Sequence, residues 1–407
     1  MGNGDSPKGA KAAFGRPRVS AYMYPWDVIG DPDVVSRLSS AGLERVSVAA
    51  AYHSVRAATP LHPQHRFVTA ETAALYRPAR AAVWAGRRLS PLGAPWTGSD
   101  NSFAQAVEAL STRGVQTSAW IVMTHNSALG RDNRDLVVRN CFGDAYEWAL
   151  CPANEEVREY AALLACEAVR GLRLEGISLE ACGQLGAAHG GHHDKTAGTY
   201  SPLGEVILSI CCCAACQRTW SVRGLDTASV VPALQAAFKA TLHAVDATPE
   251  DVLGTPLAAE LLAVRQRHLD ALFDEVLTEL RAEGISLPIT LHAQPNPWAT
   301  GASPGLTPTS ARRAHTVLVP VEPTSSHSEE LIAATRALVP EDVDIAAYLS
   351  LLGSLGTEDI GEHAKRLVDA GAGELHLYHF GLANEQQLRF FSELASLSFS
   401  ANERPCH

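Results

Sequence analysis

The stretch CCCAACQ at residues 211–217 holds the densest group of potential metal ligands in the sequence. Cys211, Cys213 and Cys216 have the spacing C-x-C-x-x-C, which can place three thiolates on one zinc ion. The fourth donor must come from elsewhere, and the candidates are Cys141, Cys151 and Cys182. A closed site of four thiolates would anchor its loop and perform no chemistry. The alternative is a helix rich in buried thiols, because cysteine often packs as a small apolar residue.

A glutamate closes the apolar run GISLE, so the Glu180 carboxyl group is expected at the rim of a low-dielectric pocket. Such an environment raises a carboxyl pKa and suits a general acid. Cleavage of a glycosidic bond also needs a second carboxylate, about 5 Å away for retention or about 6.5–9.5 Å away for inversion. Glu322 in VPVEP is the predicted partner and Asp27 the reserve. The alternative is that these glutamates are structural, paired with a basic group or a helix end.

The loop HGGHHDKTAG, residues 189–198, contains three histidines among glycines that disfavour regular structure. We interpret it as a ligand-facing loop in which His192 and His193 contact a substrate. A solvated loop is one alternative. A metal site built from His189, His192 and Asp194 is another.

Further polar and aromatic residues follow the predicted strands, where they would ring one cavity. Two tryptophans, Trp26 and Trp298, lie just beyond strands one and five, where an indole can stack on a sugar ring, although such residues more often pack. The polar members of the predicted ring are Asp27, His53, His125, Asn126, Glu180, His292, Glu322, Tyr348, Tyr378 and His379.

Apolar strand patterns alternate with helical patterns along the chain, which is typical of a parallel sheet covered by helices. Eight such units predict an α/β fold of the (β/α)8 TIM-barrel class. A doubly wound open sheet is the rival, but no phosphate-binding glycine turn follows the first strand. The predicted strands cover 18–26, 45–53, 116–126, 174–183, 288–295, 315–323, 343–353 and 374–381.

The predicted organisation is a single barrel domain over residues 17–400, preceded by a flexible leader at 1–16 and followed by a tail at 401–407. Long insertions follow strand two, at 54–100, and strand four, at 183–228. Loops after the carboxyl ends of barrel strands build the ligand site, so both insertions are expected to border it.

Composition narrows the class of ligand. The net charge of −11 and the lack of a Lys/Arg run argue against nucleic acid. No stretch has the pattern of a secretory signal or a membrane span, and the odd number of cysteines, nine, fits reduced thiols. We therefore expect a cytoplasmic protein with a small-molecule ligand, no membrane partner and no organic cofactor. The sequence is compatible with a homo-oligomer.

Five pieces of sequence carry a family resemblance. They are CPANEEVREY before strand four, the glutamate ending that strand, CCCAACQRTW after it, the helix LAVRQRHLDALFDEVLTEL, and PITLHAQPNPW at strand five. Together they resemble the (β/α)8 glycoside hydrolases, and within them the family 42 β-galactosidases and related hypothetical glycosyl hydrolases. The resemblance covers about residues 140–300.

The resemblance implies that Cys151 completes a zinc site with Cys211, Cys213 and Cys216, and that Glu180 is the acid/base. Two positions depart from the family pattern. Leu179 stands where the family has Asn, and the seventh strand, DIAAYLSLLGS, lacks the glutamate that serves as its nucleophile.

The leading hypothesis is an enzyme that cleaves a glycosidic bond of a small sugar conjugate, with Glu180 as acid/base and Glu322 as nucleophile or base. The first alternative is a metal-dependent hydrolase or isomerase that uses His53, His125, His292 and Glu180. The second is a carbohydrate-binding barrel without catalysis.

Overall fold

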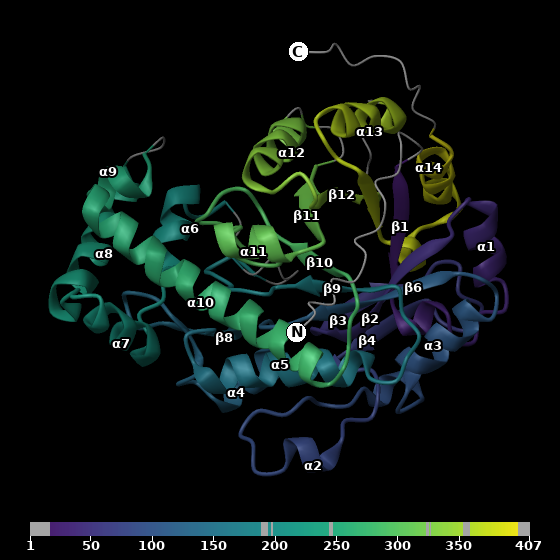
Figure 1. The fold of residues 1–407 in the computed structure, drawn as a ribbon, viewed down its shortest axis with the longest axis horizontal. Helices are drawn as coiled ribbons and strands as arrows, with labels where there is room; N and C mark the ends of the chain where they lie inside the picture. Colours follow the sequence, from purple (N-terminus) through teal and green to yellow (C-terminus); the bar gives the residue numbers. More distant parts are fainter. Residues whose placement is uncertain are drawn as a thin grey trace, which may run out of the picture.

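Eight parallel strands close into a barrel in the computed structural model (Figure 1), which describes residues 17–188, 194–196, 198–243, 247–322, 325, 327–352 and 359–397. Hydrogen bonds link them in the order β1-β13-β12-β11-β10-β9-β6-β2, and pairing of β1 with β2 completes the ring. The closed ring confirms the predicted (β/α)8 fold and excludes the open sheet. The barrel strands are β1 (Arg18–Met23), β2 (Arg45–Tyr52), β6 (Gln116–Val122), β9 (Gly176–Glu180), β10 (Ile289–His292), β11 (Thr316–Val321), β12 (Asp344–Ser350) and β13 (Glu374–Tyr378).

A helix follows each barrel strand and covers its outer side. In α3 the buried residues Phe103, Ala106, Val107 and Leu110 recur at helical spacing, which gives one apolar face toward the sheet. Between β10 and β11, where the sequence has little helical pattern, a short helix begins at a Thr307 capping box with proline at its first position. The helices are α1 (Val34–Ser40), α3 (Ser102–Ser111), α5 (Glu155–Val169), α10 (Thr255–Ala282), α11 (Pro308–Arg313), α12 (His327–Leu338), α13 (Ile360–Asp369) and α14 (Glu385–Ser396).

Insertions follow three of the strands. After β2 come the hairpin β3 (Val55–Ala58) and β4 (Phe67–Ala70), the short strand β5 (Ala74–Leu75), which pairs antiparallel with β2, and the helix α2 (Ala81–Trp84). After β6 come the helix α4 (Ser127–Asp132) and the hairpin β7 (Val137–Arg139) and β8 (Ala145–Leu150).

The insertion after β9 is helical and runs on past residue 228 to the start of α10. It contains α6 (Pro202–Leu208), α7 (Ala214–Val222), α8 (Thr227–Thr241) and α9 (Pro249–Leu253). Figure 1 shows these helices gathered on one side of the barrel, with α10 leading from them back to α5.

The long helix α10 joins two hydrophobic cores. Ala258, Leu261 and Val264, in its first half, pack in a second core with Leu234 of α8 and Trp220 of α7. Leu272, Phe273, Val276, Leu277 and Leu280, in its second half, belong to the barrel core. The insertion therefore has a core of its own and is fixed to the barrel through one continuous helix.

Polar residues occupy much of the barrel axis. Tyr22 of β1, Ser178 of β9, His292 of β10 and His376 of β13 are all buried and lie in one hydrogen-bonded group. Bulky aliphatic residues usually fill this space in such barrels. The group divides the barrel interior into an amino end and a carboxyl end.

None of the helices in the described ranges combines the length and the apolar character needed to cross a bilayer.

Candidate active site at the carboxyl end of the barrel

Glu180 is the last residue of β9, and its carboxylate faces the indole of Trp120 on the neighbouring strand β6. The register of the two strands pairs Val122 with Glu180 and Trp120 with Ser178. From that position Trp120 Nε1 donates a hydrogen bond of 2.7 Å to Glu180 Oε2. Glu180 is 7% exposed, and burial raises its pKa to about 7, an effect that the Trp120 hydrogen bond partly opposes. A carboxyl group with this pKa can donate a proton near neutral pH.

The backbone immediately after Glu180 is held in an unusual conformation. Ala181 has a φ of 51°, in the left-handed region that residues with a Cβ rarely occupy. Its N–H donates to the Ala302 carbonyl at 2.7 Å, and its carbonyl accepts from Thr124 Oγ1 at 2.8 Å. These bonds from two neighbouring loops keep the strained residue in place. They therefore fix the direction in which the Glu180 side chain leaves the strand.

Five tyrosines surround Glu180 and Trp120. The ring centroids of Tyr22 and Tyr52 lie 4.9 and 4.5 Å from that of Trp120, and the Tyr378 ring lies 6.2 Å away. Burial raises the pKa of each of the tyrosines, so their hydroxyl groups stay protonated and can donate hydrogen bonds. Tyr348 and Tyr378 are the partly exposed members. The five are Tyr22, Tyr24, Tyr52, Tyr348 and Tyr378, called here the tyrosine ring.

Asp27 and His379 form a second buried pair beside the tyrosine ring. Asp27 Oδ2 accepts the Tyr24 N–H at 2.7 Å and lies 3.9 Å from His379 Nδ1. Burial raises the pKa of Asp27 to about 7 and lowers the pKa of His379 to about 3, so the imidazole is neutral. A side chain at Gly381 would be impossible here, because its Cβ would lie 2.0 Å from Asp27 Cγ.

The two expected rim histidines after β2 and β6 lie side by side. His53 stacks on Tyr52 with a centroid distance of 4.1 Å, and His125 stacks on His53 at 4.4 Å. Both imidazoles are partly exposed. Asn126 is buried, and its carboxamide oxygen accepts the Leu129 N–H at 3.0 Å as the cap of α4.

Other expected ligand-binding residues lie deeper or elsewhere. His292 Nε2 is 2.9 Å from Ser178 Oγ, burial lowers its pKa to about 3, and the side chain points into the barrel axis. Trp26 is buried and stacks on Tyr24 at 4.5 Å. Trp298 lies in the second core of the insertion. His192 and His193 lie outside the described residues.

Glu322 follows β11 directly and is exposed. Its backbone forms two hydrogen bonds with the Ser328 hydroxyl group, which accepts the Glu322 N–H at 3.0 Å and donates to the Glu322 carbonyl at 2.9 Å. Within the described ranges no hydrogen bond or ion pair joins Glu322 to Glu180.

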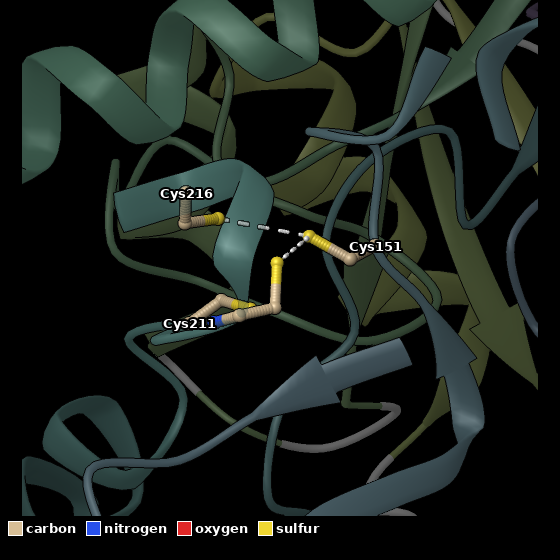
Figure 2. Close-up of side chains that lie close together, drawn as sticks. Cys151, Cys211 and Cys216 are labelled. Atoms are coloured by element: carbon tan, nitrogen blue, oxygen red, sulfur yellow. Dashed lines mark hydrogen bonds between the residues drawn. The ribbon is translucent and has the colours of Figure 1, made fainter. Parts of the chain in front are cut away.

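The four predicted cysteine ligands meet in one buried cluster at the base of the insertion. Figure 2 shows Cys151, which directly follows β8 and precedes α5, facing Cys216 of α7 and the segment of Cys211 that leads into α7. The Cys151 Sγ atom is 3.7 Å from those of Cys216 and Cys213, and all four sulfurs lie within 4.8 Å of one another. The backbone N–H groups of Arg139 and Cys213 each donate to Cys211 Sγ at 3.4 Å.

These spacings fit a metal site better than a disulfide. A disulfide would bring two sulfurs to about 2.05 Å. Four sulfurs at about 2.3 Å from a tetrahedral zinc ion would be about 3.8 Å apart, close to the separations found here. Within the described ranges this is the one group of histidine, cysteine or carboxylate donors close enough to hold a metal. Cys212 points away from it, toward the Ile210 carbonyl.

Comparison with known proteins supports the fold alone. No family profile matches the sequence, and no curated protein does. Among solved structures, the chain is similar to α-L-fucosidase isoenzyme 2 from Paenibacillus thiaminolyticus, with 12% identity, a TM-score of 0.53, and coverage of 94% of this chain and 49% of that one. It is similar to the catalytic domain of β-amylase from Paenibacillus polymyxa, with 12% identity, a TM-score of 0.53, and coverage of 94% and 98%.

A third similar structure is a β-galactosidase from the psychrophilic Marinomonas ef1, with 10% identity, a TM-score of 0.52, and coverage of 93% of this chain and 59% of that one. The chain thus spans about half of the fucosidase structure and 59% of the galactosidase structure.

Sequence reasoning missed the partner of Glu180. Trp120 lies in the middle of an apolar run, where it is indistinguishable from a core residue. The available signal was the two-residue periodicity of a strand. Trp120 and Val122 lie on the same face of β6, and they pair in register with Ser178 and Glu180. Finding it required the register of two strands that are 60 residues apart.

The raised pKa of Glu180 predicts how the free energy of unfolding depends on pH. Its folded-state pKa is raised above the ordinary 4.5, so its contribution to stability is complete below about pH 4.5 and is lost as the pH rises through about 7. Glu180→Gln should therefore match the wild type at pH 4.5 and be more stable at pH 8, by up to about 3 kcal/mol. Urea unfolding at the two pH values measures the difference.

The matched control is Glu341→Gln, which alters an exposed carboxyl group. It should leave the difference between the two pH values unchanged. Equal pH dependence of wild type and Glu180→Gln would show that Glu180 is not buried as described.

Proposed function

We propose that the protein is a glycoside hydrolase in which Glu180 is the general acid. The observation that carries the proposal is a carboxyl group at the carboxyl end of the fourth barrel strand, buried, bonded to one indole N–H, and with a pKa of about 7. Barrels of this kind place catalytic groups at that end. The similar structures named above are a fucosidase, an amylase and a galactosidase, which supports the same class of reaction.

In the proposed reaction Glu180 donates its proton to the glycosidic oxygen as the bond to the leaving group breaks. The Trp120 hydrogen bond holds the carboxyl group and stabilises the carboxylate that remains. Tyr348 and Tyr378 are the partly exposed residues of the tyrosine ring, and we expect their hydroxyl groups to donate to sugar oxygens. The rim imidazoles of His53 and His125 would bind further hydroxyl groups.

Glu322 is the proposed second carboxylate, acting as nucleophile or base. It follows β11, two strands beyond Glu180 in the barrel, and its side chain is exposed and can meet a sugar at the rim. Asp27 is the alternative, but it is buried, bonded to the Tyr24 N–H and packed against Gly381.

A binding barrel without catalysis is the competing function. The observation that favours it is the seventh strand, where DIAAYLS ends without a carboxylate at Ser350. A metal-dependent reaction at the rim has less support, because His292 is hydrogen-bonded to Ser178 within the barrel and His53 stacks on His125.

We propose that the four-cysteine cluster binds zinc with a structural role. All four donors are protein thiols, which leaves no open coordination position for a substrate. With zinc bound, the cluster would link the segment between β8 and α5 to the start of α7, and would attach the insertion to the barrel a second time. The eight described cysteines are all unpaired, which supports a reducing, cytoplasmic location.

The role of Glu180 is tested with substrates that differ in leaving group. Glu180→Gln should lower kcat/KM at least about 100-fold on 4-nitrophenyl glycosides and much less on 2,4-dinitrophenyl glycosides, whose leaving group needs no proton. The wild-type rate should fall as the pH rises through about 7, because the acid must be protonated. Glu205→Gln on α6, where burial also raises the carboxyl pKa, is the control and should retain activity. Equal losses on both substrates would exclude the acid role.

The second carboxylate is tested by comparing Glu322→Gln with Asp27→Asn on the activated substrate. We expect Glu322→Gln to lose at least about 100-fold in kcat. If Glu322 is a nucleophile, added azide should restore turnover to Glu322→Ala, whose shortened side chain leaves room for the anion, and yield a glycosyl azide. Azide rescue of Asp27→Ala, with normal activity in Glu322→Gln, would transfer the role to Asp27.

The zinc site is tested by metal content and stability. Protein purified without chelator should contain about one zinc ion per chain, and Cys213→Ser should lose it and about 3 kcal/mol or more of unfolding free energy. Cys212→Ser alters the adjacent buried thiol outside the cluster and should keep the metal. Full metal content in Cys213→Ser would contradict the assignment.

A further inference from the structure

A cavity lies at the end of the barrel opposite Glu180. Its volume is about 450 Å³, and all eight barrel strands contribute residues from their amino ends, among them Arg18 of β1, Arg45 of β2 and Glu374 of β13. The cavity is therefore centred on the barrel axis. In barrels of this fold the amino end is usually closed by packed side chains.

The cavity exists because small residues face the axis where bulky ones are usual. Ser20, Ser47, Ser118 and Gly176 contribute to its wall from four neighbouring strands of the barrel. Leucine or isoleucine at these positions would fill the space and add apolar burial. The three serines and the glycine found here instead leave a space of the size that small-molecule sites occupy, about 300–1,000 Å³.

A hydrogen-bonded layer separates this cavity from the candidate active site. The Tyr22 hydroxyl group lies 2.8 Å from Ser178 Oγ and 3.3 Å from His376 Nδ1, and Ser178 Oγ lies 2.9 Å from His292 Nε2. Ser178 and His376 also line the cavity, so the layer is its inner wall. A molecule bound in the cavity would be on the far side of Tyr22 from the mouth, and its site is distinct from that of a substrate.

The charges in the wall are balanced. Four arginines and four carboxylates line the cavity. Arg18 forms ion pairs with both Asp344 and Glu374, and Glu374 is also bonded to His376 at 3.1 Å. A balanced wall offers no net attraction to an anion. Charged pairs together with serine and threonine hydroxyl groups offer both donors and acceptors, which matches a ligand that is rich in hydroxyl groups.

We propose that this cavity, called here the amino-end cavity, binds a neutral polyol the size of a monosaccharide. The proposal does not depend on the reaction assigned to Glu180. It gives the barrel two separate sites, one at each end of its axis.

The test is thermal unfolding in the presence of D-glucose or D-galactose at millimolar concentrations, where general sugar effects on stability are small. A ligand that binds only the folded chain raises Tm, and above its Kd the rise grows with the logarithm of the ligand concentration. We expect such a rise in the wild type and in Glu180→Gln. It should be lost in Ser118→Leu, which fills the cavity, and in Arg45→Ala, which removes a partly exposed wall residue without filling it.

Three results would overturn the proposal. They are no rise in Tm with either sugar, a rise that disappears in Glu180→Gln but persists in Arg45→Ala and Ser118→Leu, and a larger rise with inorganic phosphate than with the sugars. The second would place sugar binding at the mouth, and the third would identify an anion site. Because Arg45→Ala does not fill the barrel, the test stands even if Ser118→Leu fails to fold.

Discussion

The burial of one carboxyl group against one indole N–H is the constraint on which the candidate active site depends. Burial removes water from the Glu180 carboxyl group and leaves it a single hydrogen bond from Trp120. The loss of hydration raises its pKa to about 7, although the hydrogen bond partly opposes this rise. The tyrosine ring maintains that environment, because four of its members pack against Trp120 and all of them stay uncharged. The closed barrel is what allows this, since residues from β1, β2, β6, β9, β12 and β13 meet at one end of a common axis.

The polar axis has consequences at both ends of the barrel. Hydrogen bonds among Tyr22, Ser178, His292 and His376 satisfy groups that would be costly to bury alone. Toward the carboxyl end, the Tyr22 ring of this layer packs against Trp120 and Tyr348. Toward the amino end it forms the wall of the amino-end cavity. The same residues therefore position the acid and define a second polar space.

The insertion after β9 is attached to this barrel by two different means. The long helix α10 shares its apolar face between the two cores, and the cysteine cluster places Cys151, between β8 and α5, against the cysteines at the start of α7. The four thiols lie within 4.8 Å of one another, where the two cores meet.

The sequence by itself determined the alternation of strands and helices, and with it the barrel, because hydrophobic periodicity is a local property of the chain. It also identified Glu180 as the end of a strand and the spacing of Cys211, Cys213 and Cys216. Only the tertiary structure decided which residues meet. Trp120 reaches Glu180 through strand register, His292 turns into the axis, Trp298 enters the second core, and serines on separate strands leave one cavity. These outcomes depend on contacts between residues far apart in the chain, which no local pattern contains.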